Sequence, residues 1–371
     1  MSVITPVRMP KWGLSMQEGV IIDWWKAEGA TVTEGEDLVD IETTKITNAC
    51  ESPAAGVLRK IVAKAGETLP VGALIAVIAD AAAPEAEVDA YIAEFQASYV
   101  PPSDDEEAAA ALRLAIVDTP AGAIRVGRAG ADEGVPVVLI HGYSGDLNNW
   151  QFNIEALAAV APVIALDLPG HGGSTKSVGD GSLSSLAAAV AGVIKVLQVN
   201  RVHLVGHSLG AAVAARLAID NPGLVQSLTL IAPAGLSKTP VSEAFLTGII
   251  EAQRARDLRP VIEMLVADPT LVTKDMVEDV LKAKRVDGAE EALTVLRDRM
   301  VAGEDSIALR ADLSAAPATL VIASRADRIV GPVDEASLPT GFRVVWIDGA
   351  GHMPHLEKAA EVNALLLVAL K

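Results

Sequence analysis

A five-residue segment constrains the fold of this chain more than any other feature. Residues 206–210 read Gly-His-Ser-Leu-Gly, and they join the apolar run 202–205 to the alanine-rich, helix-prone run 211–217. Glycines on both sides of a serine permit a tight strand-to-helix turn that larger side chains would block. Such a turn raises the serine hydroxyl at the amino end of a helix, where the dipole and free N–H groups stabilise negative charge. Ser208 is therefore predicted to be a nucleophile.

The carboxyl-terminal two thirds of the chain repeat a pattern of apolar run, turn and helical segment. Continuous apolar runs are typical of strands that are buried on both faces of a mostly parallel sheet. Between the fourth and fifth runs lie about 80 residues, 236–315, with helical periodicity, and we expect them to form a helical cap over the pocket. The apolar runs are 135–140, 161–166, 202–205, 228–231, 319–322 and 342–347.

A nucleophilic serine needs a general base and an acid that orients the base. His352 follows the last predicted strand and precedes the terminal helix, so it is predicted to be the base. Asp327 follows the strand around 320–323 and can reach the same end of the sheet, so it is predicted to be the acid. His355 and Asp348 are the alternatives. We expect His355 to be structural, and the closeness of Asp348 to His352 along the chain makes a side-chain contact between them awkward.

The loop after the first apolar run contains His141-Gly142-Tyr143. We expect the backbone N–H groups of Tyr143 and Leu209 to form the oxyanion hole. His141 is expected to brace this loop, and the two histidines at 203 and 207 are expected to be structural. The few histidines lack the spacing of metal ligands, so no bound metal is expected.

Residues 112–371 resemble the α/β-hydrolase family over their whole length. The loop after 140, the serine turn, Asp327 and His352 match the family in their order along the chain. The resemblance implies an α/β-hydrolase domain that works through a Ser-His-Asp triad. It does not select a substrate, because the family acts on esters, thioesters, epoxides and C–C bonds.

Residues 1–80 contain short strand-like runs separated by glycine and acidic turns, which predict a small all-β domain. Segments 9–19 and 40–45 resemble the lipoyl domains of 2-oxo acid dehydrogenase acyltransferases. The resemblance implies that Lys45 carries a covalent lipoyl group through an amide bond. Biotin carriers share this fold but usually place methionines on both sides of their lysine, where this chain has Thr44 and Ile46.

Residues 81–111 are predicted to be an acidic linker that contains alanine and proline. From Asp80 to Ala111 the sequence has nine acidic residues and no lysine or arginine, so we expect at least the ends to be extended. Within the linker, apolar residues recur at helical spacing at 88, 91, 92, 95 and 99. A short helix that rests on its own domain is the preferred interpretation, and docking of a partner protein is the alternative.

The two domains together resemble the acyltransferase components of acetoin-cleaving systems, in which a lipoyl domain precedes an α/β-hydrolase-like domain. The resemblance implies a thiamine-diphosphate-dependent partner that cleaves acetoin, a dihydrolipoamide dehydrogenase partner, and coenzyme A as the acyl acceptor. We expect Ser208 to attack the acetyl thioester and His352 to accept its proton. Two alternatives stay open: a carboxylesterase or thioesterase that the lipoyl domain recruits to a complex, and a noncatalytic lipoyl carrier and scaffold.

Composition and charge limit the partners and the compartment. The net charge is −18, which repels nucleic acids and anionic membrane surfaces. No apolar run approaches the roughly 20 residues that span a bilayer, and Met1–Pro6 lacks the features of a targeting segment. With Cys50 as the single cysteine, no intrachain disulfide can form, so a reducing cytoplasm is the expected compartment. The chain is also expected to form a homo-oligomer.

Overall fold

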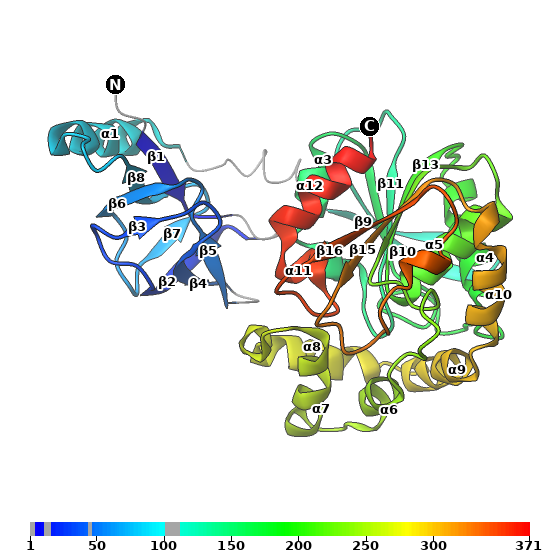
Figure 1. Ribbon diagram of the computed structural model, residues 1–371. Coiled ribbons are helices and arrows are strands. Elements are labelled where there is room, and N and C mark those ends of the chain that lie inside the picture. Colours follow the sequence, from blue (N-terminus) through cyan, green and yellow to red (C-terminus); the bar gives the residue numbers. More distant parts are fainter. Residues whose placement is uncertain (1–3, 11–15, 44–46, 101–111) are drawn as a thin grey trace. The chain divides into compact units, whose positions relative to one another are not determined.

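The computed structural model describes residues 4–10, 16–43, 47–100 and 112–371. The chain divides into two compact units, Met1–Ala111 and Leu112–Lys371 (Figure 1). None of the helices in these described ranges is long and apolar enough to cross a membrane.

The first unit is built from two four-stranded antiparallel sheets. Side chains alternate along such strands, so every second residue can enter a core between the sheets. Ile21, Leu38, Ile41, Leu58 and Ile78 fill this core and are at most 1% exposed. One sheet has the order β1 (Ile4–Arg8), β8 (Leu74–Ala79), β6 (Gly56–Ile61), β3 (Thr31–Val32), and the other has β5 (Thr47–Glu51), β4 (Asp37–Glu42), β2 (Glu18–Trp24), β7 (Thr68–Pro70).

The predicted lipoyl attachment residue, Lys45, lies outside the described residues. The strands on either side of it, β4 and β5, are antiparallel neighbours, and their register pairs Glu42 with Thr47. Cys50 on β5 is buried, and burial raises the pKa of its thiol to about 12. A thiol in that state is inert.

Helix α1 (Glu85–Ser98) packs on the first unit. Its Val88 is 2% exposed and belongs to an apolar cluster with Leu74 and Val77 of β8. Tyr99, which ends the helix, donates a hydrogen bond of 2.6 Å to the carbonyl of Val71. The helix therefore rests on its own unit, as the preferred interpretation of its apolar spacing expected.

The second unit contains one eight-stranded sheet, and the six strands from β11 to β16 are parallel neighbours in it. This arrangement confirms the predicted mostly parallel sheet. β9 and β10 add an antiparallel hairpin at one edge. The order is β16 (Phe342–Ile347), β15 (Thr319–Ser324), β14 (Val225–Ile231), β13 (Val202–His207), β11 (Val137–Ile140), β12 (Val163–Leu166), β10 (Gly122–Ala129), β9 (Arg113–Thr119).

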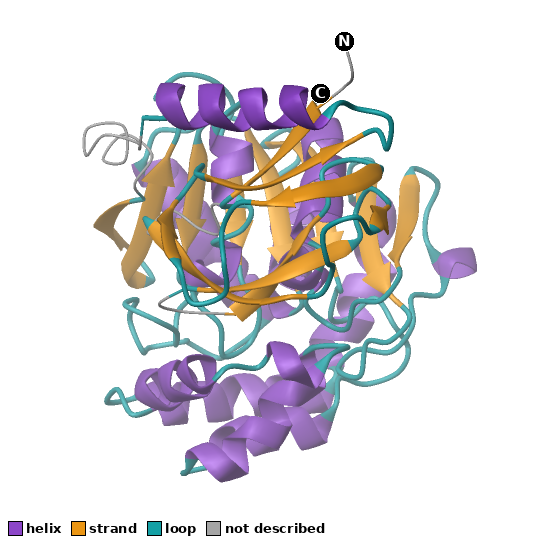
Figure 2. Ribbon diagram, turned by 90° about the vertical axis from the view of Figure 1, so that its left-hand side faces the viewer, coloured by secondary structure: helices purple, strands orange, loops and turns teal. Residues whose placement is uncertain are grey.

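Helices cover both faces of this sheet (Figure 1). Figure 2 colours helices purple and strands orange in a second view. Figure 1 shows α4 (Leu183–Val196) and α5 (Leu209–Asp220) on one side, and α3 (Ile154–Ala158) with α12 (Ala359–Ala369) on the other. The strands between these layers are almost free of exposed surface, which explains their continuous apolar runs. The short elements η1 (Leu147–Trp150), η5 (Glu335–Ser337) and α11 (Pro354–Glu357) lie in the connections.

A further group of helices lies between β14 and β15, where the sequence predicts a cap. Figure 1 shows α6 to α9 gathered at one end of the sheet. Arg216 of α5 pairs with Asp312 of α10 at 2.7 Å, so the last helix of this group is bound to the sheet layer. The group consists of α6 (Glu243–Glu251), α7 (Ala255–Ile262), η2 (Glu263–Leu265), η3 (Pro269–Leu271), α8 (Lys274–Lys284), α9 (Ala289–Ala302), α10 (Glu304–Asp312) and η4 (Leu313–Ala315).

A charge at position 88 tests whether α1 belongs to the first unit. Val88→Asp places a carboxylate in an apolar contact without a partner, which we expect to destabilise this unit by about 3–5 kcal/mol. Ala93→Asp adds the same charge at an exposed position of the same helix and is the matched control. Calorimetry should show a lower unfolding temperature for the first unit in Val88→Asp only. Equal effects of the two variants would contradict the packing of α1.

Candidate active site

Ser208 lies at the turn between β13 and α5, with φ 53° and ψ −116°. A positive φ is costly for a residue with a side chain, by roughly 1–3 kcal/mol. A methyl group on Gly206 would lie 2.3 Å from the carbonyl oxygen of Gly210, and one on Gly210 would lie 2.2 Å from that of Ile140. Positions 206 and 210 must therefore be glycine, as predicted from the sequence, and the backbone of the turn is held close to β11.

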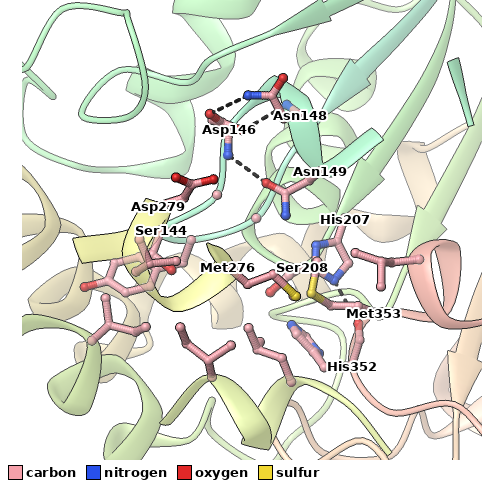
Figure 3. Close-up of a pocket in the computed structure, with 18 of the residues that line it drawn as sticks. Ser144, Asp146, Asn148, Asn149, His207, Ser208, Met276, Asp279, His352 and Met353 are labelled. Atoms are coloured by element: carbon pink, nitrogen blue, oxygen red, sulfur yellow. Dashed lines mark hydrogen bonds between the residues drawn. The ribbon is translucent and has the colours of Figure 1, made fainter. Parts of the chain in front are cut away.

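The structure brings Asp327 and His352 together, although 25 residues separate them. His352 Nδ1 lies 2.8 Å from Asp327 Oδ2, and the two side chains are 2% and 6% exposed. Because the Nδ1–H group donates its hydrogen bond to the carboxylate, the Nε2 atom of the neutral His352 ring carries no proton and can act as a base. Ser208 and His352 line the same cavity, as Figure 3 shows. Contacts between nucleophile and base often tighten only when substrate binds.

The two alternative residues occupy different environments. Asp348 is exposed at the end of β16. His355 is fully buried in α11, where its ring lies 4.7 Å from that of Trp150 and 4.5 Å from that of His207. Burial lowers the pKa of His355 to about 3, so this ring is neutral and packs as part of the interior. The geometry thus favours Asp327 and His352 over both alternatives.

The backbone of His352 is held at both of its polar groups. Its N–H donates to the carbonyl of Leu265 in the cap, at 2.8 Å. Its carbonyl accepts a hydrogen bond of 2.8 Å from Nε2 of His207, the residue before Ser208. Burial, followed by the neighbouring histidines, holds the pKa of His207 well below its usual value, so this ring is neutral. A histidine expected to be structural therefore links the nucleophile turn to the base.

The predicted oxyanion donors lie beside the nucleophile. Leu209 is the first residue of α5, where a helix leaves its N–H groups without intrahelical acceptors. Tyr143 belongs to the loop after β11, and a methyl group on the adjacent Gly142 would lie 3.0 Å from Cβ of Ser208. In the described part of the chain, the N–H groups of Tyr143 and Leu209 donate no hydrogen bond to a protein acceptor.

Two histidines brace the loop that contains Tyr143. Nδ1 of His141 donates to the carbonyl of Gly142 at 2.7 Å, and its Nε2 accepts from the N–H of Leu168 at 2.9 Å. Nε2 of His171 accepts from the N–H of Ser144 at 3.1 Å. Burial lowers the pKa of His171 to about 3, which keeps it a neutral acceptor. His141 thus has the bracing contacts that the sequence analysis expected.

The cavity at these residues has a volume of about 200 Å³. Figure 3 shows Asp146, Asn148 and Asn149 grouped on one side of it, away from His352. The cap contributes mainly apolar lining, so a ligand there would be shielded from water on that side. The apolar lining includes Phe245, Ile249, Ile262, Leu265, Met276, Val280 and Met353.

Some of the contacts around His352 were not found from the sequence. The roles of Leu265 and His207 as hydrogen-bond partners of its backbone depend on contacts between distant segments, and no local motif marks them. Among the described residues, no group of three or more His, Cys, Asp or Glu side chains is placed to hold a metal.

Comparisons with known proteins agree with this architecture. Residues 137–365 match a model described as the alpha/beta hydrolase family, and residues 5–78 match one described as biotin-requiring enzyme. A dihydrolipoyllysine-residue acetyltransferase component of the acetoin cleaving system from Cupriavidus necator is 42% identical over 98% of this chain and 96% of the relative. The protein of that name from Pseudomonas putida is 42% identical over 100% of both chains.

The chain belongs to the family of acetoin-cleaving-system acetyltransferase components. The likeness to solved structures concerns the fold of the second unit. A 2-hydroxy-6-oxo-6-phenylhexa-2,4-dienoate hydrolase from Rhodococcus superposes with a TM-score of 0.62 and 24% identity, over 70% of this chain and 99% of that one. The predicted family resemblance and the predicted fold class are both confirmed.

A substitution at position 210 tests the close contact beneath the nucleophile. In Gly210→Ala the new methyl group meets backbone atoms that cannot move aside, so we expect the free energy of unfolding to fall by about 3 kcal/mol or more. Gly223→Ala is the control, because its methyl group meets nothing within 4 Å and adds only backbone strain at φ +90°, about 1 kcal/mol. Urea denaturation measures both. A smaller effect at Gly210 than at Gly223 would contradict the geometry.

Proposed function

We propose that this chain transfers an acetyl group from a lipoyl arm on Lys45 to coenzyme A through Ser208, His352 and Asp327. One observation carries the proposal: a biotin/lipoyl-type unit and a pocket containing Ser208 beside the Asp327–His352 pair occur in one chain. Relatives that share both units along their whole length are named as acetyltransferase components of the acetoin cleaving system.

The first unit suits a lipoyl attachment. The antiparallel β4 and β5 pair at Glu42 and Thr47, so only four residues, among them Lys45, connect the two strands. When bound through an amide, lipoate supplies a dithiol that carries acetyl as a thioester.

Ser208 would attack the thioester carbonyl carbon with its hydroxyl oxygen. His352 Nε2 takes the hydroxyl proton, and the Asp327 carboxylate stabilises the imidazolium that forms. The N–H groups of Tyr143 and Leu209 would donate to the negatively charged oxygen. The tetrahedral species then breaks its C–S bond, and His352 returns the proton to the departing thiolate. Ser208 is left as an acetyl ester.

Coenzyme A would resolve this ester by the reverse sequence. His352 takes the proton of the incoming thiol, the sulfur attacks the acetyl carbon, and the Ser208 oxygen leaves with the proton from His352. Water can attack the same ester, so the acceptor depends on which nucleophile reaches it. The apolar cap residues Ile262, Leu265 and Met276 line the cavity and favour exclusion of water.

Hydrolysis is the second candidate, and the likeness of the second unit supports it. A 2-hydroxy-6-oxo-6-phenylhexa-2,4-dienoate hydrolase from Comamonas testosteroni is 29% identical over 65% of this chain and 89% of the relative. The match to that protein covers only part of this chain. The lipoyl-type unit of this chain favours the transferase.

The proposal also implies partners. A thiamine-diphosphate-dependent component that cleaves acetoin would load the arm, and a dihydrolipoamide dehydrogenase would reoxidise it. We place this system in the cytoplasm, with the chain as a homo-oligomer.

Product analysis tests the proposed transfer. S-acetyl-dihydrolipoamide and coenzyme A are incubated with wild type, Ser208→Ala or Ser177→Ala, and acetyl-CoA and acetate are measured. We expect acetyl-CoA as the main product and a loss on the order of a thousandfold or more in Ser208→Ala, because the nucleophile is gone. Ser177 is exposed, and its variant should match wild type. Excess acetate would favour a hydrolase, and equal turnover by Ser208→Ala would refute the serine mechanism.

The attachment of the arm is measured separately on the intact protein. The mass of the wild type should exceed that of Lys45→Arg by one lipoyl group, after allowing for the substitution. Free S-acetyl-dihydrolipoamide bypasses Lys45, so the two results are independent.

A further inference from the structure

A single short piece of the cap contacts both loops that carry the acid and the base. This piece, residues 263–267, is called the cap segment here, and it includes η2 and the two residues after it. The loop after β16 carries His352, and the loop after β15 carries Asp327. Three separate sets of hydrogen bonds join the cap segment to these loops.

The first contact is made by the backbone of the base. The His352 N–H donates to the carbonyl of Leu265 at 2.8 Å. The preceding residue, Gly351, approaches so closely that an added methyl group would lie 2.7 Å from the N atom of Ala267 and 2.7 Å from the carbonyl carbon of Val266. The two backbones are therefore in direct contact, and a shift of the cap segment would move the backbone of His352.

The second contact is made by the carboxylate of Glu357 in α11. Its Oε2 accepts from the N–H of Ala267 in the cap segment at 2.7 Å. Its Oε1 accepts from the N–H groups of Gly351 and Met353, at 2.8 and 3.3 Å. One carboxylate thus bridges the cap segment and the residues on both sides of His352.

The third contact comes from Arg328, the residue after the predicted acid. Its Nη2 donates to the carbonyls of Glu263 and Val266, the latter at 2.8 Å. Arg328 is exposed, so water weakens this contact, whereas Glu357 is half-buried. Glu357 should therefore contribute more than Arg328.

The same piece of the cap also reaches the substrate space. Leu265, in the cap segment, and Ile262, directly before it, line the cavity together with Ser208 and His352. A group bound against these two side chains would therefore contact the segment whose Leu265 carbonyl accepts the hydrogen bond from His352.

We propose that Glu357 is a positioning residue that holds the cap segment against the His352 loop, with Arg328 as a weaker second contact on the Asp327 side. The position of the cap and the alignment of the His352–Asp327 pair are then set together. The proposal rests on the proposed serine mechanism, and it adds residues that do not touch the reacting atoms.

The placement of Glu357 argues against a purely local role. Its carboxylate accepts three hydrogen bonds, one from the cap segment and two from the His352 loop, and none of the three donors lies within α11. Burial raises the pKa of the Glu357 carboxyl, because it disfavours the charged form. The three N–H donors offset part of that cost. A glutamine there could accept on one side only, because its NH₂ group would face N–H donors on the other.

The rate of covalent labelling of Ser208 tests the proposal without depending on the natural acceptor. A rhodamine-tagged fluorophosphonate is mixed with the full-length protein, where the Ser208 oxygen displaces fluoride and His352 takes the proton. We expect Glu357→Gln to be labelled between about tenfold and a hundredfold more slowly than wild type, because a small displacement of the base is costly. Arg328→Gln should be slower by a smaller factor.

Two matched controls remove similar groups without touching the cap segment. Glu361→Gln alters an exposed glutamate at the start of α12, and Arg325→Gln alters an exposed arginine whose guanidinium lies 4.6 Å from the ring centre of Trp346. Both should be labelled at the wild-type rate. The downfield proton resonance of His352 Nδ1 gives a second readout, since it reports the contact with Asp327 and does not respond to a change in stability alone. It should shift or vanish in Glu357→Gln.

The outcomes distinguish a failure of the positioning role of Glu357 from a failure of the serine mechanism on which it rests. Wild-type labelling and an unchanged resonance in folded Glu357→Gln would overturn the positioning role. If that variant does not fold, wild-type labelling of Arg328→Gln would overturn it instead. If Ser208→Ala is labelled like wild type, the serine mechanism itself fails, and the positioning proposal falls with it.

Discussion

The backbone turn at Ser208 is the constraint on which the rest of the site depends. A serine at φ 53° is held there because β13 and α5 are packed into the centre of the second unit, with glycines where the backbones nearly touch. β13 lies between β11 and β14 in the sheet, so the turn has parallel neighbours on both sides. Its strain is therefore offset by an entire buried core, which fixes the hydroxyl at the edge of the cavity.

The base is positioned by polar contacts rather than by packing alone. Asp327 holds the ring of His352, His207 holds its carbonyl, and Leu265 holds its N–H. The buried histidines around it stay neutral, because burial makes a second positive charge near His352 costly. This arrangement reserves proton transfer for His352 and leaves the other rings as fixed donors and acceptors.

Much of the second unit could be predicted because its signals are local. Six parallel strands appear as apolar runs, and Ser208, Asp327 and His352 each follow such a strand at the same edge of the sheet. The hairpin of β9 and β10 was missed. Its strands carry Arg113, Arg125 and Arg128 among apolar residues, and these charges break the continuous apolar pattern. An edge hairpin can hold such charges because it is partly exposed.

The contacts around His352 could not be predicted, for a different physical reason. Glu357 lies in the first turn after the base, but its partner Ala267 is 90 positions away, and only the folded chain brings them together. Helix α1 could be predicted in part. Its apolar spacing predicted a helix, whereas the surface it covers became clear only from the contact of Val88 with β8.

The most direct test of the account is a search for an acetyl group on Ser208. The protein is mixed with S-acetyl-dihydrolipoamide in the absence of coenzyme A, quenched in acid, digested and analysed by mass spectrometry. The account predicts that the peptide containing Ser208 gains the mass of one acetyl group, and that coenzyme A then removes it with formation of acetyl-CoA. Acetyl-CoA formation by a protein whose Ser208 is never acetylated, under quenching fast enough to trap the ester, would contradict it.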